Sequence, residues 1–362
     1  MNILFFTAHP AQVHNFRGLK NELELKGHKI HWIATNKDIS CYLLDYYGIN
    51  YNLVKKPGKS IISKTIILLR NTKYCLHFIR NHNIDIIISR VSPYAALAGF
   101  LSGIPHIALA DTESSGIYNN IFSKFVSALL TPCSFKKELR SDQIRFDGNI
   151  ELFYLHPNRF SPVSKSEVSE WLGISPNDPY IIMRFVAWDA HHDKGLTGYS
   201  HENKIRAAEE LSKYAKVYIS SEKELPEELI QYKINTAPER IHDVLANASL
   251  FLGESATMAS ECAVLGTPAV FLDKIGRGYT DEEGQYDLVY NFCNSPEEQL
   301  KSIIKGVNLL KDPCLKERMN KNRKEFLHNK IDVTCFMLWF IEDWPDSYNI
   351  MKENPEYQNK FM

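Results

Sequence analysis

The chain has 362 residues, of which 44% are hydrophobic and 23% are charged, and its formal net charge is −1. This composition is typical of a globular protein of about two domains and excludes a disordered chain, a collagen-like repeat and a coiled coil. The near-zero net charge also argues against a nucleic-acid-binding protein. Residues 1–160 nevertheless carry 12 Lys and 7 Arg against 11 acidic residues, a balance of +8, which leaves −9 for the remainder. This asymmetry predicts two domains with different partners.

The first half of the chain alternates β-rich runs with helical patterns. Strands are expected at Asn2–Thr7, Lys29–Ala34, Asn52–Val54, Ile84–Ser89, His106–Leu109 and Ser127–Thr131. Apolar residues at helical spacing predict helices over Gln12–Lys26 and Pro93–Leu101. Buried runs that alternate with helices are typical of a parallel sheet with right-handed crossovers.

The stretch Pro157–Lys165 has two prolines and no periodicity, which indicates a linker, and the alternation then restarts. Strands are expected at Tyr180–Phe185, Val217–Ser220, Leu250–Leu252 and Ala269–Leu272. Helices are expected over His201–Lys213, Ile241–Ala246, Ala256–Leu265, Pro296–Leu310 and, as one long helix, Leu315–Glu342. The sequence therefore predicts an α/β protein of two tandem Rossmann-like, doubly wound domains, residues 1–158 and 159–330. The cleft between them, at the carboxyl ends of the strands, is the expected ligand site.

The segment Gly253–Pro268 places small residues at a turn from strand to helix. Amide groups in the first turn of a helix have no intrahelical partner and lie at the positive end of the helix dipole, so they can bind phosphate. The hydroxyls of Ser255 and Thr257 would add donors, and Glu261 could accept two hydrogen bonds from a ribose diol. The alternative is an N-capping Ser255 with a glutamate placed much as in a capping box.

The sequence lacks the motifs of several other enzyme classes. A serine-hydrolase elbow requires a small fifth residue where this chain has Thr257, and His328 is the only histidine after Ser255. The nicotinamide fingerprint G-x-G-x-x-G and the P-loop are absent. No D-x-D occurs, which argues against a sugar donor held through a metal on two aspartates. We therefore expect no metal and no cofactor.

A cluster of metal-type side chains lies between two of the expected elements. It consists of Asp189, His191, His192 and Asp193. Histidine and carboxylate are metal ligands, but no closed ligand set is evident. The sequence favours a loop at the cleft over a metal site.

Three further sets of polar residues follow predicted strands. His9 could transfer a proton or cap the next helix. Asp111 and Glu113 could supply a general base, or Asp111 could be an N-cap. Arg184 could bind a diphosphate through two hydrogen bonds or form a surface ion pair.

Residues 55–80 form a basic segment without an acidic residue. Its cations are Lys55, Lys56, Lys59, Lys64, Arg70, Lys73 and Arg80, interleaved with isoleucines, leucines and a phenylalanine. Such a segment is typical of an anchor on anionic lipid. The alternative is a core-facing helix with a solvated basic face.

The seven cysteines are scattered, with no C-x-x-C pair, which favours a reducing compartment over a disulfide framework or a zinc site. The first residues lack the pattern of a signal peptide, and no stretch approaches the ~18 apolar residues that span a bilayer. We expect a cytoplasmic protein with a peripheral contact to the inner face of the membrane.

The run Ser255–Pro268 resembles the nucleotide-sugar turn of two-domain GT-B glycosyltransferases and of UDP-N-acetylglucosamine 2-epimerases. The chain resembles more closely a prokaryotic family, domain of unknown function 354. The matching stretches are Phe6–Gly18, Asp111–Glu113, Thr131–Glu138, Tyr154–Pro157, Arg184–Asp193, Tyr218–Glu222, Gly253–Pro268 and Lys330–Pro345.

The resemblance implies a UDP-sugar bound mainly by the second domain. Ser255, Ala256 and Thr257 would hold the diphosphate, Glu261 the ribose, and backbone near Arg240–His242 the uracil. The implied nucleotide-sugar site comprises Arg184, Ser220, Arg240, Ile241, His242, Glu254, Ser255, Ala256, Thr257 and Glu261. Residues 331–362 would form a C-terminal helix that crosses back to the first domain. Ala256-Thr257 stands where epimerases and many relatives have Gly-Gly.

Together these features predict a metal-independent glycosyltransferase that moves a sugar from a UDP-sugar to a saccharide or lipid-linked acceptor in surface polysaccharide synthesis. His9, Asp111 or Glu113 would deprotonate the acceptor hydroxyl. The alternatives are an enzyme similar to UDP-N-acetylglucosamine 2-epimerases and a non-catalytic nucleotide-sugar-binding protein. The basic first half favours the transferase, because an epimerase has no need of a basic surface.

Overall fold

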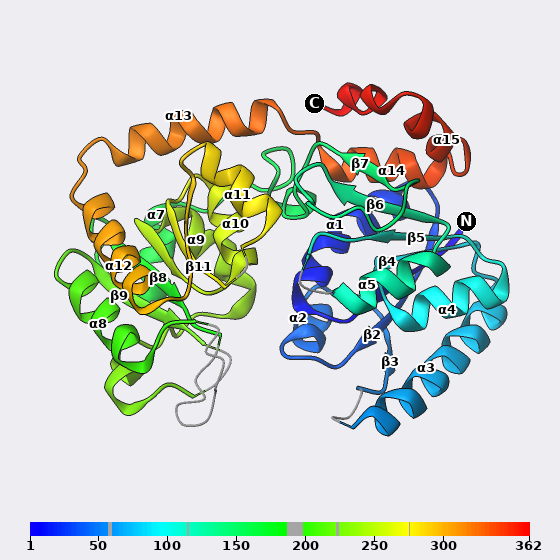
Figure 1. Ribbon diagram of the computed structural model, residues 1–362, viewed down its shortest axis with the longest axis horizontal. Helices are drawn as coiled ribbons and strands as arrows, with labels where there is room; N and C mark the ends of the chain where they lie inside the picture. The colour runs from blue at the N-terminus through cyan, green and yellow to red at the C-terminus, as the bar shows by residue number, and fades with distance from the viewer. Residues whose placement is uncertain (57–59, 114–115, 187–197, 222–223, 275) are drawn as a thin grey trace. The chain divides into compact units, whose positions relative to one another are not determined.

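The computed structural model describes residues 1–56, 60–113, 116–186, 198–221, 224–274 and 276–362. They fold into two compact units, each built on its own parallel sheet (Figure 1). Unit 1 comprises Met1–Arg159 together with Lys330–Met362, and unit 2 comprises Phe160–Asn329. The chain therefore leaves unit 1 after Arg159 and re-enters it at Lys330.

The sheet of unit 1 has seven parallel strands in the order β3-β2-β1-β4-β5-β6-β7. They are β1 (Asn2–Thr7), β2 (Lys29–Thr35), β3 (Asn52–Val54), β4 (Ile86–Arg90), β5 (His106–Leu109), β6 (Ala128–Pro132) and β7 (Ile144–Phe146). The central strands are buried along their length, as expected for a parallel sheet whose two faces are both covered.

The helices of unit 1 connect these strands and end the chain. They are α1 (Pro10–Leu25), α2 (Ser40–Tyr46), α3 (Ile61–Asn81), α4 (Pro93–Ser102), α5 (Gly116–Phe122), α6 (Leu152–Leu155), α14 (Val333–Glu342) and α15 (Asp346–Glu353), with 3-10 turns η1 (Ser123–Phe125) and η4 (Pro355–Phe361). α14 packs on α1 and α6. The hydroxyl of Thr334 donates to the backbone carbonyl of Phe153 at 2.9 Å, which fixes α14 against unit 1.

The sheet of unit 2 has five parallel strands in the order β12-β11-β10-β8-β9. They are β8 (Tyr180–Arg184), β9 (Lys216–Ser220), β10 (Leu250–Gly253), β11 (Ala269–Leu272) and β12 (Val289–Phe292). The helices are α7 (Lys165–Leu172), α8 (His201–Ser212), α9 (Ile241–Asn247), α10 (Ala256–Leu265), α11 (Gly278–Gln285), α12 (Pro296–Leu310) and α13 (Leu315–His328), with 3-10 turns η2 (Glu227–Tyr232) and η3 (Pro238–Arg240). The predicted pair of doubly wound α/β domains is confirmed.

The prediction of one helix over Leu315–Glu342 is wrong. The structure divides it into α13, in unit 2, and α14, in unit 1. Asp332 caps α14 by accepting a hydrogen bond from the backbone N–H of Cys335 at 3.0 Å, and it also accepts from Nε of Arg159 at 3.3 Å. The break contains neither proline nor glycine, so only this capping aspartate marks it in the sequence.

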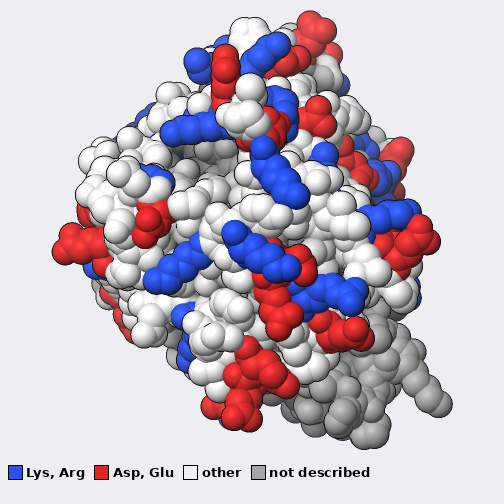
Figure 2. Space-filling model, turned by 90° about the vertical axis from the view of Figure 1, so that its left-hand side faces the viewer, with Lys and Arg blue, Asp and Glu red and all other residues white. Residues whose placement is uncertain are grey.

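Charges of both signs are interspersed where the molecule is viewed from the side of α8 and α12 (Figure 2). Lys301 on α12 pairs with Glu297 and Glu298, at 2.7 and 2.9 Å. On α8, Arg206 lies 4.0 Å from Glu202. The negative balance of the second half therefore does not form a uniformly acidic face in this view. Among the described residues, no helix is both long and apolar enough to cross a bilayer.

Candidate functional site

The strand order of unit 2 reverses between β8 and β10. From β8 the chain forms β9 on one side and later β10 on the other side. In doubly wound sheets, ligands bind outside the carboxyl ends of the two strands that flank such a reversal. Of the predicted nucleotide-sugar residues, Arg184 and Ser220 end β8 and β9, and Glu254 to Thr257 directly follow β10.

The ends of β8 and β10 approach each other very closely. Gly253 pairs with Arg184 in the sheet register. A Cβ on Gly253 would lie 2.4 Å from the carbonyl oxygen of Arg184, so only glycine fits there. At the end of β9, the Ser220 hydroxyl accepts a hydrogen bond from Nη1 of Arg184 at 3.0 Å. The structure thus brings together Arg184 and Ser220, two residues that sequence analysis assigned to the same site.

Helix α10 begins immediately after β10, with Ser255 as its N-cap. The Ser255 hydroxyl accepts from the backbone N–H of Met258 at 3.3 Å, so the capping alternative is confirmed for this residue. In the part of the chain that the structure describes, the backbone N–H groups of Ala256 and Thr257 have no acceptor. These two groups lie at the positive end of the α10 dipole and are suited to an anion.

Glu261, on the next turns of α10, is paired with His242 on α9. Its Oε1 lies 3.0 Å from Nε2 of His242, and both side chains are buried. The ring of Phe160 meets that of His242 edge to face, with centroids 6.2 Å apart. The pair joins the predicted ribose ligand to a residue of the segment whose backbone the resemblance assigns to uracil. Sequence analysis did not anticipate the contact, because it depends on how α9 packs against α10.

The neighbouring residues of the uracil segment differ in exposure. Ile241 begins α9 and is partly buried. Arg240 is exposed, and its guanidinium carbon lies 4.3 Å from the centroid of the Trp171 ring. That stacking holds the segment against α7, and it leaves the guanidinium edges accessible.

Glu254 is occupied by contacts within unit 2. Its carboxylate accepts from the backbone N–H groups of Val186 and Tyr199, at 2.8 and 2.7 Å. Nζ of Lys204 lies 3.8 Å away, and burial lowers the pKa of that lysine. The carboxylate therefore links Val186 to Tyr199, which stand on either side of residues 187–197 in the sequence. The predicted cluster of Asp189, His191, His192 and Asp193 falls in that segment, outside the described residues.

In unit 1 the strand order reverses between β1 and β4. His9 lies two residues after the end of β1 and caps α1, and its Nδ1 accepts from the backbone N–H of Ala11 at 3.3 Å. A neutral imidazole that accepts at Nδ1 carries its proton on Nε2. This favours His9 as a hydrogen-bond donor over a proton acceptor.

The two predicted carboxylates of unit 1 lie after β5 and are both buried. Asp111 forms an ion pair with Arg90, the last residue of β4, and accepts from the Thr112 hydroxyl at 2.7 Å. Glu113 accepts from the backbone N–H of Lys136 at 3.3 Å. Sequence analysis missed Arg90. Arg90 could have been found from its position, because it ends a β-branched strand just as Arg184 ends β8 of unit 2.

Metal ligation has no support among the residues that the structure describes, where no group of three His, Cys, Asp or Glu side chains could hold an ion.

The sequence model of the family described as "Protein of unknown function (DUF354)" matches residues 3–274. No curated protein sequence matches the chain.

Among solved structures, the chain is similar to the UDP-GlcNAc 2-epimerase of Neisseria meningitidis bound to UDP-GlcNAc, with a TM-score of 0.65 and 14% identity over 91% of this chain and 99% of that one. It is also similar to MurG of Acinetobacter baumannii (TM-score 0.57, 16% identity, 94% and 99% covered). A third is a glycosyltransferase from Rickettsia africae ESF-5 (TM-score 0.59, 15% identity, 98% and 99% covered). At such identities these similarities show the GT-B fold alone.

Proposed function

The chain belongs to the DUF354 family, and we propose that it is a GT-B glycosyltransferase that moves a sugar from a UDP-sugar to a saccharide or lipid-linked acceptor in surface polysaccharide synthesis. One arrangement carries the proposal: at the strand reversal of unit 2, Arg184 ends β8 opposite Gly253, and α10 begins three residues after Gly253 with amides of Ala256 and Thr257 that have no acceptor among the described residues. A guanidinium and a helix N-terminus are both suited to a diphosphate. The fold shared with an epimerase bound to UDP-GlcNAc supports this choice of ligand.

The donor would be held by three parts of unit 2. The diphosphate would contact Arg184 and the start of α10, the ribose would contact Glu261, and the uracil would contact backbone at Arg240–His242. As the bond to the sugar breaks, negative charge develops on the leaving diphosphate. Preorganised donors at that position stabilise the transition state more than the ground state. The proposal assigns this stabilisation to side chains and amides, and not to a metal.

The acceptor hydroxyl would lose its proton to a carboxylate of unit 1. Asp111 and Glu113 are the candidates, with His9 as a hydrogen-bond donor to the substrate. The ion pair with Arg90 stabilises the charged form of Asp111, which makes it a weaker base.

A peripheral contact with the inner membrane surface is the second part of the proposal. On the first half of α3, Ile61 and Ile62 are 82% and 73% exposed, and Ile66 and Leu69 are also exposed. Lys64 and Arg70 lie among them, and both are exposed. Exposed isoleucines interleaved with cations are suited to the interface of an anionic bilayer. This would place the protein in the cytoplasm, where a lipid-linked acceptor could reach it.

An epimerase is the second candidate, because several similar structures are UDP-GlcNAc 2-epimerases. It would use the same donor pocket to eliminate and re-add UDP, with no acceptor. The third candidate is a protein that binds nucleotide sugars without turnover.

Incubation with a panel of UDP-sugars, followed by ³¹P and ¹H NMR, separates these functions. A transferase releases UDP, and adding a suitable acceptor accelerates the release. An epimerase yields a second UDP-sugar, and a binding protein shows saturable UDP binding alone. If no UDP-sugar and no UDP binds, all three are wrong.

A further inference from the structure

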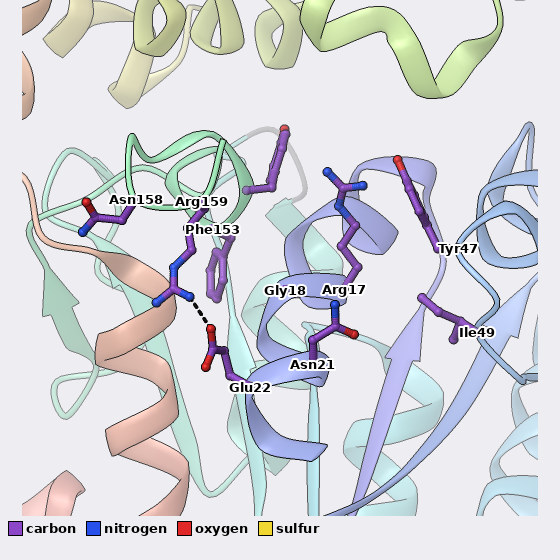
Figure 3. A pocket seen from close by; sticks show the side chains of 10 residues that line it. Arg17, Gly18, Asn21, Glu22, Tyr47, Ile49, Phe153, Asn158 and Arg159 are labelled. Atoms are coloured by element: carbon purple, nitrogen blue, oxygen red, sulfur yellow. Dashed lines mark hydrogen bonds and ion pairs between the residues drawn. The ribbon is translucent and has the colours of Figure 1, made fainter. Parts of the chain in front are cut away.

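A pocket of about 400 Å³ lies in unit 1 beside α1 (Figure 3). Its lining includes Arg17, Gly18, Asn21, Tyr47, Tyr154 and Arg159. These residues come from α1, from the chain after α2, and from α6 and the residues that follow it. No motif of the sequence analysis includes the pocket as a whole.

Arg17 is the cation of the pocket that no carboxylate of the described residues neutralises. Its guanidinium carbon lies 4.3 Å from the centroid of the Tyr47 ring. It has no ion pair and no side-chain hydrogen bond with any described residue. Stacking on a ring orients the guanidinium plane and leaves its N–H edges available for an oxyanion.

Arg159, the second arginine, is already paired. It lies 2.5 Å from Oε1 of Glu22 and 3.3 Å from Oδ2 of Asp332, and it donates to Sγ of Cys335 at 2.9 Å. Figure 3 shows Arg159 and Glu22 on one side of Gly18, and Arg17 and Tyr47 on the other. The unmatched positive charge is therefore localised at Arg17.

Aromatic rings provide rigid apolar surface next to this cation. The ring of the buried His14 lies 5.5 Å from that of Tyr154 and 5.9 Å from that of Tyr47, between centroids. The exposed amide of Asn21 adds a donor and an acceptor. A saccharide presents apolar C–H faces together with hydroxyl groups, and this lining offers partners for both.

Gly18 keeps the pocket open. A Cβ built on it would meet only one atom within 4 Å, the carbonyl oxygen of Phe153 at 3.7 Å, which is an ordinary contact. A side chain at this position would occupy pocket volume without displacing the backbone.

We propose that this pocket binds a saccharide that carries one oxyanion group, a phosphate or a carboxylate, with the oxyanion on Arg17 and the sugar against Tyr47. The role of this saccharide as the acceptor of the transfer reaction rests on the proposed function. Its binding in the pocket does not depend on that function.

Calorimetry with the full chain tests the proposal. The probes are N-acetylglucosamine 1-phosphate, glucuronic acid, neutral N-acetylglucosamine and inorganic phosphate. We expect one of the two anionic sugars to bind more tightly than both the neutral sugar and phosphate alone. Arg17→Gln and Gly18→Met should each weaken that binding about tenfold or more. The control Arg206→Gln removes an exposed arginine of unit 2 and should change nothing.

Three other outcomes would contradict saccharide binding in this pocket. Binding of inorganic phosphate as tight as that of the sugars, or anionic-sugar binding that both variants retain, overturns the proposal. So does the absence of binding by both anionic sugars at millimolar concentration. If Gly18→Met does not fold, Arg17→Gln alone decides. The affinity for UDP, measured in parallel, should be the same in both variants and the wild type. If the wild type does not bind UDP, the proposed function fails, and that result is independent of saccharide binding in the pocket.

Discussion

Oε1 of Glu261 lies 3.0 Å from Nε2 of His242, and this pair links α10 to α9 inside unit 2. A carboxylate positioned by a neighbouring imidazole loses less freedom when it binds a diol than one that moves freely in solvent. The pairing therefore strengthens the case for Glu261 as the ribose ligand.

Glu261→Gln keeps an oxygen that can accept from His242 but removes the charge. We expect the affinity for UDP and for uridine to fall by about 1–3 kcal/mol, the contribution of hydrogen bonds to a charged group. Calorimetric titration measures both ligands. The control Glu209→Gln changes an exposed carboxylate on α8 and should bind normally. Unchanged affinity in the Glu261 variant would remove this residue from the site.

Arg184→Gln should show whether Arg184 contributes to binding of the diphosphate or of the nucleoside part of UDP. The variant keeps a donor that can reach Ser220 but lacks the positive charge. UDP affinity should fall by about 1.5–3 kcal/mol while uridine affinity is unchanged, because only UDP carries the diphosphate. An equal loss for the two ligands would mean that Arg184 supports the fold of the pocket and does not contact the diphosphate.

Gly253→Ala tests the close approach of β10 to β8. Its Cβ would lie 2.4 Å from the carbonyl oxygen of Arg184, so the strands must separate. We expect a loss of about 1–3 kcal/mol in the free energy of unfolding, together with weaker UDP binding. Gly18→Ala is the matched control, because its Cβ meets only an ordinary contact at 3.7 Å. Equal stability of the two variants in urea would contradict the close approach.

His106 should make unit 1 sensitive to acid. Its Nε2 lies 2.8 Å from the Ser89 hydroxyl, and burial lowers its pKa from 6.5 to about 3. Below a pH of about 6.5, His106 is protonated in the unfolded chain but stays neutral in the folded one. The free energy of unfolding therefore falls as the pH falls, by about 1.4 kcal/mol per pH unit.

His106→Gln cannot titrate, so this variant should lose less stability than the wild type between about pH 7 and about pH 5. Urea unfolding at both pH values measures the difference. Parallel losses would indicate that His106 is protonated in the folded protein.

Substitutions on α3 test the membrane contact. Ile62→Ser with Ile66→Ser should lower binding to vesicles that contain phosphatidylglycerol, because each exposed isoleucine contributes apolar area at the interface. Adding salt should weaken the wild type's binding as well. Leu25→Ser, at an 84% exposed leucine outside α3, is the control. Vesicle sedimentation that is the same for all three proteins would contradict the contact.

Much of the architecture follows from local patterns. The bounds of α10 and α12, Ala256–Leu265 and Pro296–Leu310, agree with those predicted, because Ser255 and Ser295 cap them and apolar spacing defines their length. The edge strands β7 and β12 were not predicted. They have three and four residues, too few for a clear period, although β3, which is as short, was predicted.

Contacts between elements could not be predicted from spacing. Arg90 and Asp111 pair because β4 and β5 are neighbours in the sheet. The pocket beside α1 depends on α6 and on Arg159, more than 130 residues after Arg17 along the chain. Strand order and helix packing, which a single sequence does not reveal, determine these groupings.

The return of the chain to unit 1 at Lys330 delays completion of that unit during synthesis. Unit 2 is continuous, so it can close as soon as it has left the ribosome. The partners of α14 on α1 and α6 emerge much earlier and stay exposed to solvent until α14 arrives. The nascent protein therefore passes through a stage with a finished second unit and an incomplete first one.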